Sequence, residues 1–467
     1  MSGSAPVRVV VESDAPADLA RRAMAVVWGC TASKRGLLWW KGTWLMWRET
    51  SPGVGRWEVG VNETEMRAAL WEFLSVCVTE EQEDEMTTVT TRVRVDKRMV
   101  DDVMDAVKGF SLFKAETLPV WLRKPQGVEE WECVGFEDVV VNARTGETWE
   151  RTQDWVDVGV LPVAWASGRA ECPLMDRTVS EWGEGQERWV EMWWRLMGLA
   201  VGNERRLGVI GVLEGLTRGG KGVTSRLVKK LKGAGAFMTD VKSLTSEYGL
   251  WGAQVAGVIV VEEVSKLGKS QAETAGSVVK KVVGRDVLTL NGKWQLPVRT
   301  QINATVLMVG NTIPNLPDHA RAISSKLRVL PFNRSWAGKE DPGLEEKLEA
   351  ELAGVARKAV EALGRVLREP DSAKKFDVEL GREEVEDFQR EVNEADDFLC
   401  QWFVKVGSGM VAAATMWEVF RRERGPVMSE NRFHKGFMKT TSWALGRRKV
   451  NGRMFYVGLA MKADGQE

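Results

Sequence analysis

The sequence is poor in the residues that most often build metal and disulfide sites. Its 467 residues include two histidines, His319 and His434, and five cysteines scattered without close pairs. We therefore expect neither a zinc site nor a disulfide framework, and free thiols fit a reducing compartment. No apolar run approaches the ~18 residues of a membrane-spanning helix, and the N-terminus lacks a basic-then-apolar leader. These absences predict a soluble, unexported, cytoplasmic protein with no membrane partner.

An excess of charge of one sign is also missing, because 65 basic residues face 66 acidic ones. Any contact with nucleic acid must therefore come from local patches. One such patch lies near the C-terminus, where we expect a helix, a turn, a second helix and then strands around Asn451-Gly452. Its basic residues are Arg421, Arg422, Arg424, Arg432, Lys435, Lys439, Arg447, Arg448, Lys449 and Arg453. This local excess favours a DNA-binding surface over a merely solvated basic face.

The most informative stretch is Val209–Leu231, VIGVLEGLTRGGKGVTSRLVKKL. A short apolar run is followed by glycines and a lysine, then by apolar residues at helical spacing, which predicts strand, glycine loop and helix. Gly215, Gly220 and Lys221 fit the pattern G-x-x-x-x-G-K, in which backbone amides cradle a polyphosphate and the lysine reaches its β- and γ-phosphates. Gly219 and Gly222 would add to this cradle.

One position of the pattern fails. A serine or threonine that would hold magnesium is expected at 222, where this chain has glycine. Thr224 and Ser225 follow on other sides of the helix, and we assign Thr224 to the nucleotide and metal. A glycine-rich turn before a basic helix is the alternative interpretation.

Buried runs and helices alternate beyond the loop, which predicts a parallel sheet covered on both faces. Val258–Val261 ends in Glu262 and Glu263, where one carboxylate would place magnesium and the other would polarise an attacking water. Ala304–Val309 is a second buried strand, and Asn311 just after it could orient water near a γ-phosphate or simply form a turn. Lys326 and Arg328 precede a further strand and could stabilise transition-state charge in a neighbouring subunit.

Elsewhere the patterns predict a helix over 7–29, aromatic antiparallel strands over 36–61 and helices at Glu63–Val78 and Lys97–Lys108. The acidic run Glu80–Glu85 is expected to be a loop. Short strands follow between Leu118 and Pro173, with a hairpin turn at Thr145-Gly146. Single helices are expected at Trp182–Leu199, Gln271–Val283 and Leu344–Leu367, with a linker at 370–375. Tryptophans among basic residues in 36–61 could stack nucleobases, but an aromatic core is the commoner arrangement.

Taken together, the motifs GLTRGGKG, VIVVEE, LMVGN and SSKLRVLPFNRSW resemble the superfamily 3 helicases, in particular the C-terminal part of phage and plasmid primase-helicases. The resemblance implies an α/β fold with a parallel-sheet, AAA+-like P-loop ATPase core (181–370). A mixed α+β accessory or collar region (1–180) would precede it, and a winged-helix DNA-binding domain (371–467) would follow. It implies ATP and Mg²⁺ as cofactors, and a hairpin with Lys293 at its basic tip that follows DNA through a ring.

We therefore expect a homohexameric, ATP-dependent replicative DNA helicase that acts on single-stranded and forked DNA in a bacterial host cytoplasm. Primer synthesis, if the mobile element has it, is expected to reside in a separate primase or polymerase. Gly222, Val223 and Lys326 depart from the family pattern and favour the alternative of a non-hydrolysing or weakly hydrolysing replication initiator. A DNA motor for packaging or defence would use the same residues.

Overall fold

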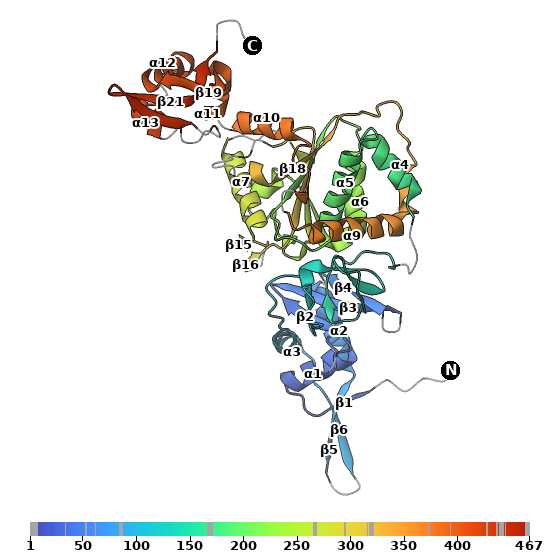
Figure 1. Ribbon diagram of the computed structural model, residues 1–467. Helices are drawn as coiled ribbons and strands as arrows, with labels where there is room; N and C mark the ends of the chain where they lie inside the picture. The colour runs from blue at the N-terminus through green and yellow to red at the C-terminus, as the bar shows by residue number, and fades with distance from the viewer. Residues whose placement is uncertain are drawn as a thin grey trace.

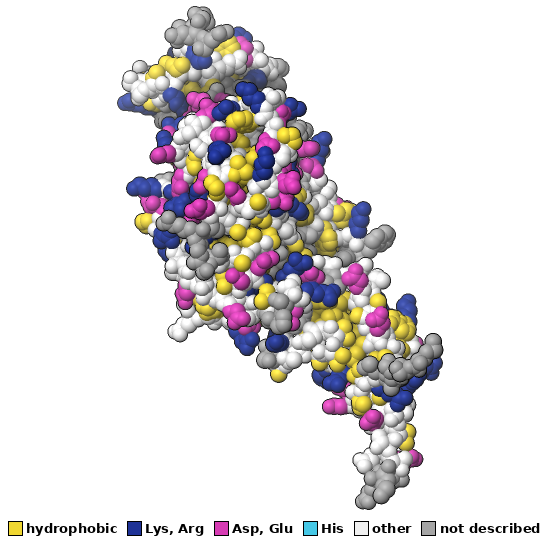
Figure 2. Space-filling view, turned by 90° about the vertical axis from the view of Figure 1, so that its right-hand side faces the viewer, with side chains coloured by type: hydrophobic (Ala, Val, Ile, Leu, Met, Phe, Trp, Pro, Cys, Tyr) yellow, Lys and Arg dark blue, Asp and Glu magenta, His cyan; other side chains and the backbone are white. Residues whose placement is uncertain are grey.

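The computed structural model describes residues 8–462 except 33, 52–53, 61, 84–86, 166–170, 265–268, 294–295, 315, 317–321, 372–373, 393, 426–427, 436–437, 439–442 and 444. The chain forms three modules that follow one another along an elongated molecule (Figure 1). Basic and acidic side chains are interspersed over the face shown in Figure 2, as the balanced composition predicts.

The N-terminal module packs helices against small sheets. Its elements are β1 (Val9–Val11), α1 (Pro16–Val26), β2 (Leu37–Trp40), β3 (Thr43–Ser51), β4 (Val54–Val59), α2 (Glu63–Ser75), β5 (Cys77–Gln82), β6 (Thr88–Arg92), α3 (Lys97–Phe110), β7 (Val120–Trp121), β8 (Cys133–Gly135), β9 (Val139–Asn142), β10 (Thr148–Glu150) and β11 (Trp155–Val156). The antiparallel β2-β3-β4 sheet and the β9–β10 hairpin confirm the predicted strands over 36–61 and the predicted turn at Thr145-Gly146. Trp40, Trp44 and Trp57 are buried, so most of the aromatic strands form core.

Two predictions for this module are wrong. The stretch predicted as one helix over 7–29 begins with strand β1, whose β-branched residues pair in parallel with β5. The predicted acidic loop at Glu80–Glu85 contributes Glu80 and Glu81 to β5, which forms an exposed antiparallel hairpin with β6. In both places long-range strand pairing overrides the local pattern.

The central module is built on a five-stranded parallel sheet in the order β13-β14-β17-β12-β18. Its elements are α4 (Pro173–Trp182), α5 (Glu187–Val201), β12 (Ile210–Gly215), α6 (Lys221–Lys232), β13 (Ala236–Asp240), β14 (Val258–Val264), α7 (Lys269–Gly284), β15 (Val287–Leu290), β16 (Val298–Gln301), β17 (Thr305–Gly310), β18 (Leu327–Phe332), α8 (Leu344–Glu349) and α9 (Leu352–Arg368). The predicted strand, loop and helix over Val209–Leu231 are confirmed as β12, the loop and α6.

Alternate residues of each strand enter opposite hydrophobic cores. Val258, Leu307 and Leu330 face the core built with α5, α6 and α9, while Ile259 and Val306 face the core that contains α7 (Figure 1). This two-sided burial explains why the strands read as continuous apolar runs. The single helices predicted at 182–199 and 344–367 are each divided: α4 and α5 meet at Gly183–Gln186, and α8 and α9 meet at Ala350–Glu351.

The central module continues past residue 370, the end that the family resemblance implies. Phe376 lies in the core on the α5 side of the sheet, and Phe388 of α10 (Arg382–Val392) lies in the core on the α7 side. Burial of these side chains on the central module offsets the cost of ordering the linker. The C-terminal module follows with α11 (Glu394–Trp402), β19 (Phe403–Ala412), α12 (Ala413–Arg424), α13 (Glu430–Lys435), β20 (Gly446–Val450) and β21 (Arg453–Met461).

This last module packs its helices on an antiparallel sheet of order β19-β21-β20. The helix pair and the turn at Asn451-Gly452 match the sequence prediction, whereas β19 was not predicted. Across the described ranges, no helix is both long and apolar enough to cross a bilayer.

Candidate nucleotide site

The loop between β12 and α6 requires its glycines. Gly215 and Gly220 have φ angles of 131° and 109°, which side chains rarely adopt. A Cβ atom on Gly215 would lie 2.4 Å from the carbonyl oxygen of Phe332, and one on Gly220 would lie 2.4 Å from the ring of Trp182. Phe332 and Trp182 therefore pack against one side of the loop, and the loop backbone can contact a ligand on the opposite side.

Helix α6 begins with an open N-terminus. Its N-cap, Gly220, supplies no side-chain hydrogen bond, and no acidic residue lies in the first turn. The first-turn amides at Lys221, Gly222 and Val223 have no acceptor within the helix, and the helix dipole adds positive potential there. An uncapped 12-residue helix after a glycine loop fits the phosphates of a nucleotide.

The side chain of Lys221 lies folded against the loop. It is 6% exposed, and its Nζ donates to the carbonyl oxygens of Gly215, at 2.8 Å, and Leu216, at 2.6 Å. Burial lowers the pKa of Lys221, while the carboxylate of Glu214 acts in the opposite direction. A phosphate would have to replace these two carbonyl contacts to engage the ammonium group.

The acidic pair lies at a bulge in β14. The pairing of β14 with β17 shifts register between Val261 and Val264, and Glu263 adopts a positive φ of 50°. Such a conformation is costly for a residue other than glycine and often marks a functional position. Glu263 is exposed, whereas Glu262 is partly buried and accepts a hydrogen bond from the hydroxyl of Ser225. The bulge therefore gives the two carboxylates different environments.

Ser225, rather than Thr224, connects helix α6 to the acidic pair. The Thr224 hydroxyl lies on the α5 side, where it accepts from Trp193 Nε1 at 3.2 Å and donates to the Gly220 carbonyl oxygen at 3.3 Å. Both hydroxyls are buried, with Thr224 2% and Ser225 0% exposed. The sequence assigned the metal-binding hydroxyl to Thr224, whereas in the structure it is Ser225 that hydrogen-bonds Glu262.

Asn311 lies at the same edge of the sheet. It follows β17, which is placed between β14 and β12, and its Nδ2 donates to Thr217 Oγ1 of the loop at 3.2 Å. The loop, Glu262 and Asn311 thus meet at the carboxyl ends of three adjacent parallel strands. Among the described residues, no three His, Cys, Asp or Glu side chains form a metal cluster, so a magnesium ion here would depend on the nucleotide phosphates.

The segment that follows β18, which begins with the NRSW of the motif SSKLRVLPFNRSW, covers the phosphate loop. Ser335 Oγ donates to the Thr217 carbonyl oxygen at 2.8 Å, and the Trp336 amide donates to the Arg218 carbonyl oxygen at 3.0 Å. Arg218 also forms a 2.7 Å ion pair with Glu340. The signal available in the sequence was the polar cluster NRSW directly after an apolar strand.

Lys326 and Arg328 lie away from the loop of their own chain. In the parallel pairing of β12 with β18, Arg328 is opposite Gly211, whereas the loop begins at Gly215 opposite Phe332. The Arg328 guanidinium donates to the carbonyl oxygens of Ser325, at 3.0 Å, and of Leu327, at 2.7 Å, and burial lowers its pKa. Neither cation therefore belongs to the site within one chain.

The predicted DNA-contacting residues occupy two other places. Lys293 is exposed in the turn of the β15–β16 hairpin, as predicted. In the C-terminal module Arg448 is exposed on β20, but Arg447 donates to the hydroxyl of Tyr456 at 2.9 Å. Arg432 and Lys435 fall within α13, with side chains outside the described set, and Lys439 lies outside the described residues.

No family model and no curated protein matches this chain. Its solved neighbours include two apo structures of the NrS-1 C-terminal region (residues 305–718), each 12% identical with a TM-score of 0.50. The matches cover 96% and 95% of this chain and 100% of each neighbour. From its N-terminal module to its C-terminal module, this chain is similar in fold to the NrS-1 C-terminal region.

Proposed function

We propose that this chain is an ATP-dependent replicative DNA helicase of a phage, plasmid or other mobile element, of the superfamily 3 kind. The observation that carries the proposal is the meeting of Lys221, Glu262 and Asn311 at one edge of the parallel sheet. The β13-β14-β17-β12-β18 order fits an AAA+-like ATPase core, because it brings all three strand ends together. The fold shared with the NrS-1 region supports a helicase-related role.

We assign a separate role in ATP hydrolysis to each residue of the site. The first-turn amides of α6 and Lys221 would bind the phosphates, and Glu262 with Ser225 would hold Mg²⁺. Glu263, exposed at the bulge, would orient and deprotonate water, and Asn311 would fix the water's position. Bound MgATP supplies the electrophilic γ-phosphorus for in-line attack.

The cations on β18 would serve a neighbouring subunit of a hexameric ring. Lys326 and Arg328 lie at the amino end of β18, whereas their own phosphate loop follows the carboxyl end of the adjacent β12, which fits action across an interface better than action within one chain. Arg328 is already bonded to two carbonyls, so Lys326 is the better candidate. Lysine carries the charge but cannot bind a phosphate in the bidentate way of arginine.

DNA would be bound at two places. Lys293 on the hairpin would follow single-stranded DNA in the ring channel, and the basic β20 surface, with α13, would hold forked or duplex DNA in a winged-helix manner. Primer synthesis would come from a partner protein.

ATP hydrolysis with and without single-stranded DNA, together with native mass, tests the proposal. Lys221→Ala should abolish hydrolysis and unwinding while leaving the fold intact. Lys229→Ala, on the exposed face of the same helix, is the matched control and should retain both activities. Unwinding by Lys221→Ala at the rate of the unaltered chain would refute the assignment.

A non-hydrolysing replication initiator is the second candidate. The observation that favours it is the closed state of Lys221, whose ammonium group is satisfied by two loop carbonyls. A monomer that binds ATP and DNA without hydrolysis would establish this alternative.

A further inference from the structure

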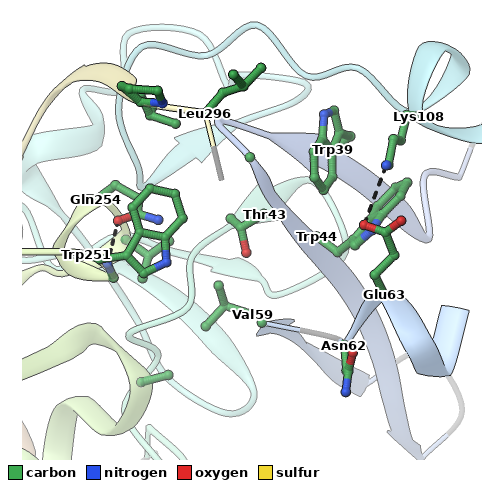
Figure 3. A pocket seen from close by; sticks show the side chains of 17 residues that line it. Trp39, Thr43, Trp44, Val59, Asn62, Glu63, Lys108, Trp251, Gln254 and Leu296 are labelled. Atoms are coloured by element: carbon green, nitrogen blue, oxygen red, sulfur yellow. Dashed lines mark hydrogen bonds and ion pairs between the residues drawn. The ribbon is translucent and has the colours of Figure 1, made fainter. Parts of the chain in front are cut away.

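A cleft of about 990 Å³ lies between the N-terminal module and the central module (Figure 3). The β2-β3-β4 sheet contributes Trp39 and Thr43, the central module contributes Trp251 and the segment Leu296–Val298, and helix α3 contributes Lys108. No residue of the phosphate loop lines this cleft, so it is separate from the nucleotide site.

Two indole rings border the cleft from opposite modules. Trp39 is partly exposed and rests on the buried Trp44, with ring centroids 4.7 Å apart. Trp251 is also partly exposed and packs on the hairpin backbone, because a Cβ on Gly292 would lie 2.8 Å from its ring. Figure 3 shows the two indoles on either side of an open space, with Thr43 and Val59 between them. Both rings are held by packing and still present surface to the cleft.

A lysine and a glutamate lie at the rim of the cleft beside Trp39. Lys108 Nζ lies 5.3 Å from the ring centroid of Trp39 and 3.6 Å from the carboxylate of Glu63. Glu63 also pairs with Arg67 at 3.1 Å, and Arg67 in turn pairs with Asp101. The two charges of the lining therefore balance, and a phosphate would engage Lys108 in place of Glu63.

The cleft adjoins the β15–β16 hairpin. Leu296, which is 86% exposed, forms part of its wall just before β16. An exposed apolar side chain, two indoles and a lysine are the components of sequence-tolerant binding to single strands, in which bases stack and the backbone is neutralised.

We propose that this cleft binds bases of single-stranded DNA by stacking on Trp39 and Trp251, with Lys108 beside the phosphate. The inference rests on the proposed function, because it places the cleft next to the hairpin that would follow the strand. The volume of the cleft is at the upper end of the range for small-ligand sites. A space of this size can hold several bases, or one dinucleotide in an extended conformation.

The test is binding of fluorescein-labelled oligo(dT) by the full chain, measured by anisotropy at fixed salt. Trp39→Leu and Trp251→Leu should each weaken binding about ten-fold, the usual loss for a base–aromatic stack. Trp71→Leu is the matched control, because Trp71 is 43% exposed on α2 and does not line the cleft. The affinity of the Trp71→Leu variant for oligo(dT) should be unchanged. ATP hydrolysis without DNA should be unchanged in all three variants.

Photocrosslinking of the unaltered chain gives an answer that does not depend on folding of the variants. An oligonucleotide that carries 5-bromodeoxyuridine should crosslink to peptides with Trp39 or Trp251. Crosslinks elsewhere, with unchanged affinity of both variants, would overturn the cleft proposal and leave the helicase proposal standing. Absence of single-strand binding by the unaltered chain would refute both.

Discussion

At the scale of single residues, the nucleotide site depends on which of two adjacent hydroxyls faces the acidic pair. Glycine at 222 and the hydroxyls at 224 and 225 are visible in the sequence, but helical spacing alone does not say which face packs against α5. In the structure the indole N–H of Trp193 donates to the Thr224 hydroxyl, whereas the Ser225 hydroxyl donates to Glu262. The lysine, the carboxylates and Asn311 were identifiable because each follows a glycine loop or a buried strand.

Ser225→Ala should therefore reduce magnesium-dependent ATP hydrolysis at least about ten-fold, since the metal would lose a hydroxyl partner and Glu262 its hydrogen bond. Steady-state hydrolysis over a magnesium titration measures the effect, and excess metal should restore part of the rate. Thr224→Ser keeps the hydroxyl that Trp193 binds and is the control. Equal rates for Ser225→Ala and the unaltered chain would contradict this role.

A buried lysine near the junction of the two modules predicts a pH dependence of stability. Lys232 is 1% exposed, and its Nζ donates to the Val201 carbonyl oxygen at 3.2 Å. Burial lowers its pKa from 10.5 to about 8, with Asp157 acting in the opposite direction and Arg205 adding to the decrease. The unfolded chain therefore binds more protons than the folded chain between these values, and stability rises with pH across that window.

The contribution of Lys232 to the free energy of unfolding should increase by about 2 kcal/mol from pH 7.5 to 9.5. Buried cysteines titrate in the same range with the opposite sign, because burial raises the pKa of Cys77 to about 11 and of Cys133 to about 12. Their effect cancels in the difference between the unaltered chain and Lys232→Met, measured by denaturant titration. A difference that does not change with pH would show that Lys232 is not the responsible group.

At the scale of elements, the sequence predicted those helices, strands and turns that are determined by interactions within a short stretch of chain. The strand, loop and helix at Val209–Leu231 depend on glycine dihedrals and apolar spacing within one short stretch. Strands β1 and β19 were missed because their partners, β5 and β21, lie far away in the sequence. The break between α8 and α9 was missed because apolar residues continue at helical spacing across Ala350–Glu351, whereas the glycines at 183 and 185 do mark the turn before α5.

The start of α6 gives a matched pair of glycine substitutions. Gly220→Ala should destabilise the chain by at least about 2 kcal/mol and abolish nucleotide binding, because a Cβ meets the Trp182 ring at a positive φ. Gly222→Ala should retain both properties, since its Cβ meets only the mobile end of Arg226 at 3.1 Å. Thermal unfolding and binding of a fluorescent nucleotide measure the two effects. Equal behaviour of the pair would contradict the strained geometry at Gly220.

At the scale of the whole molecule, the resemblance implied that the central module ends at 370, and the structure shows that residues beyond 370 pack on it. The stretch after 370 is polar with few apolar residues, so it resembles a linker. Phe376 and Phe388 nevertheless enter the two cores on opposite sides of the sheet. The spacing of residues within a segment does not show whether its side chains pack against a sheet that is distant in the sequence.

A chain that ends at Val392 should therefore fold and hydrolyse ATP, whereas a chain that ends at Pro370 should lose stability and aggregate. The shorter chain leaves two aromatic sites on the central module uncovered, each worth about 2 kcal/mol of apolar burial. Thermal unfolding and size-exclusion chromatography of the two chains measure the outcome. Equal stability would show that the segment 371–392 is not part of the central module.

The turn between β2 and β3 also ties the N-terminal module to the hairpin. Lys41 donates to Thr300 of β16 and to the Glu116 carbonyl oxygen, and a Cβ on Gly42 would lie 3.5 Å from Val298. Asn303 just beyond β16 donates to the Leu118 carbonyl oxygen at 3.0 Å. The hairpin cannot advance alone without breaking these bonds. In the proposed helicase, any movement of the hairpin would therefore carry the N-terminal module with it.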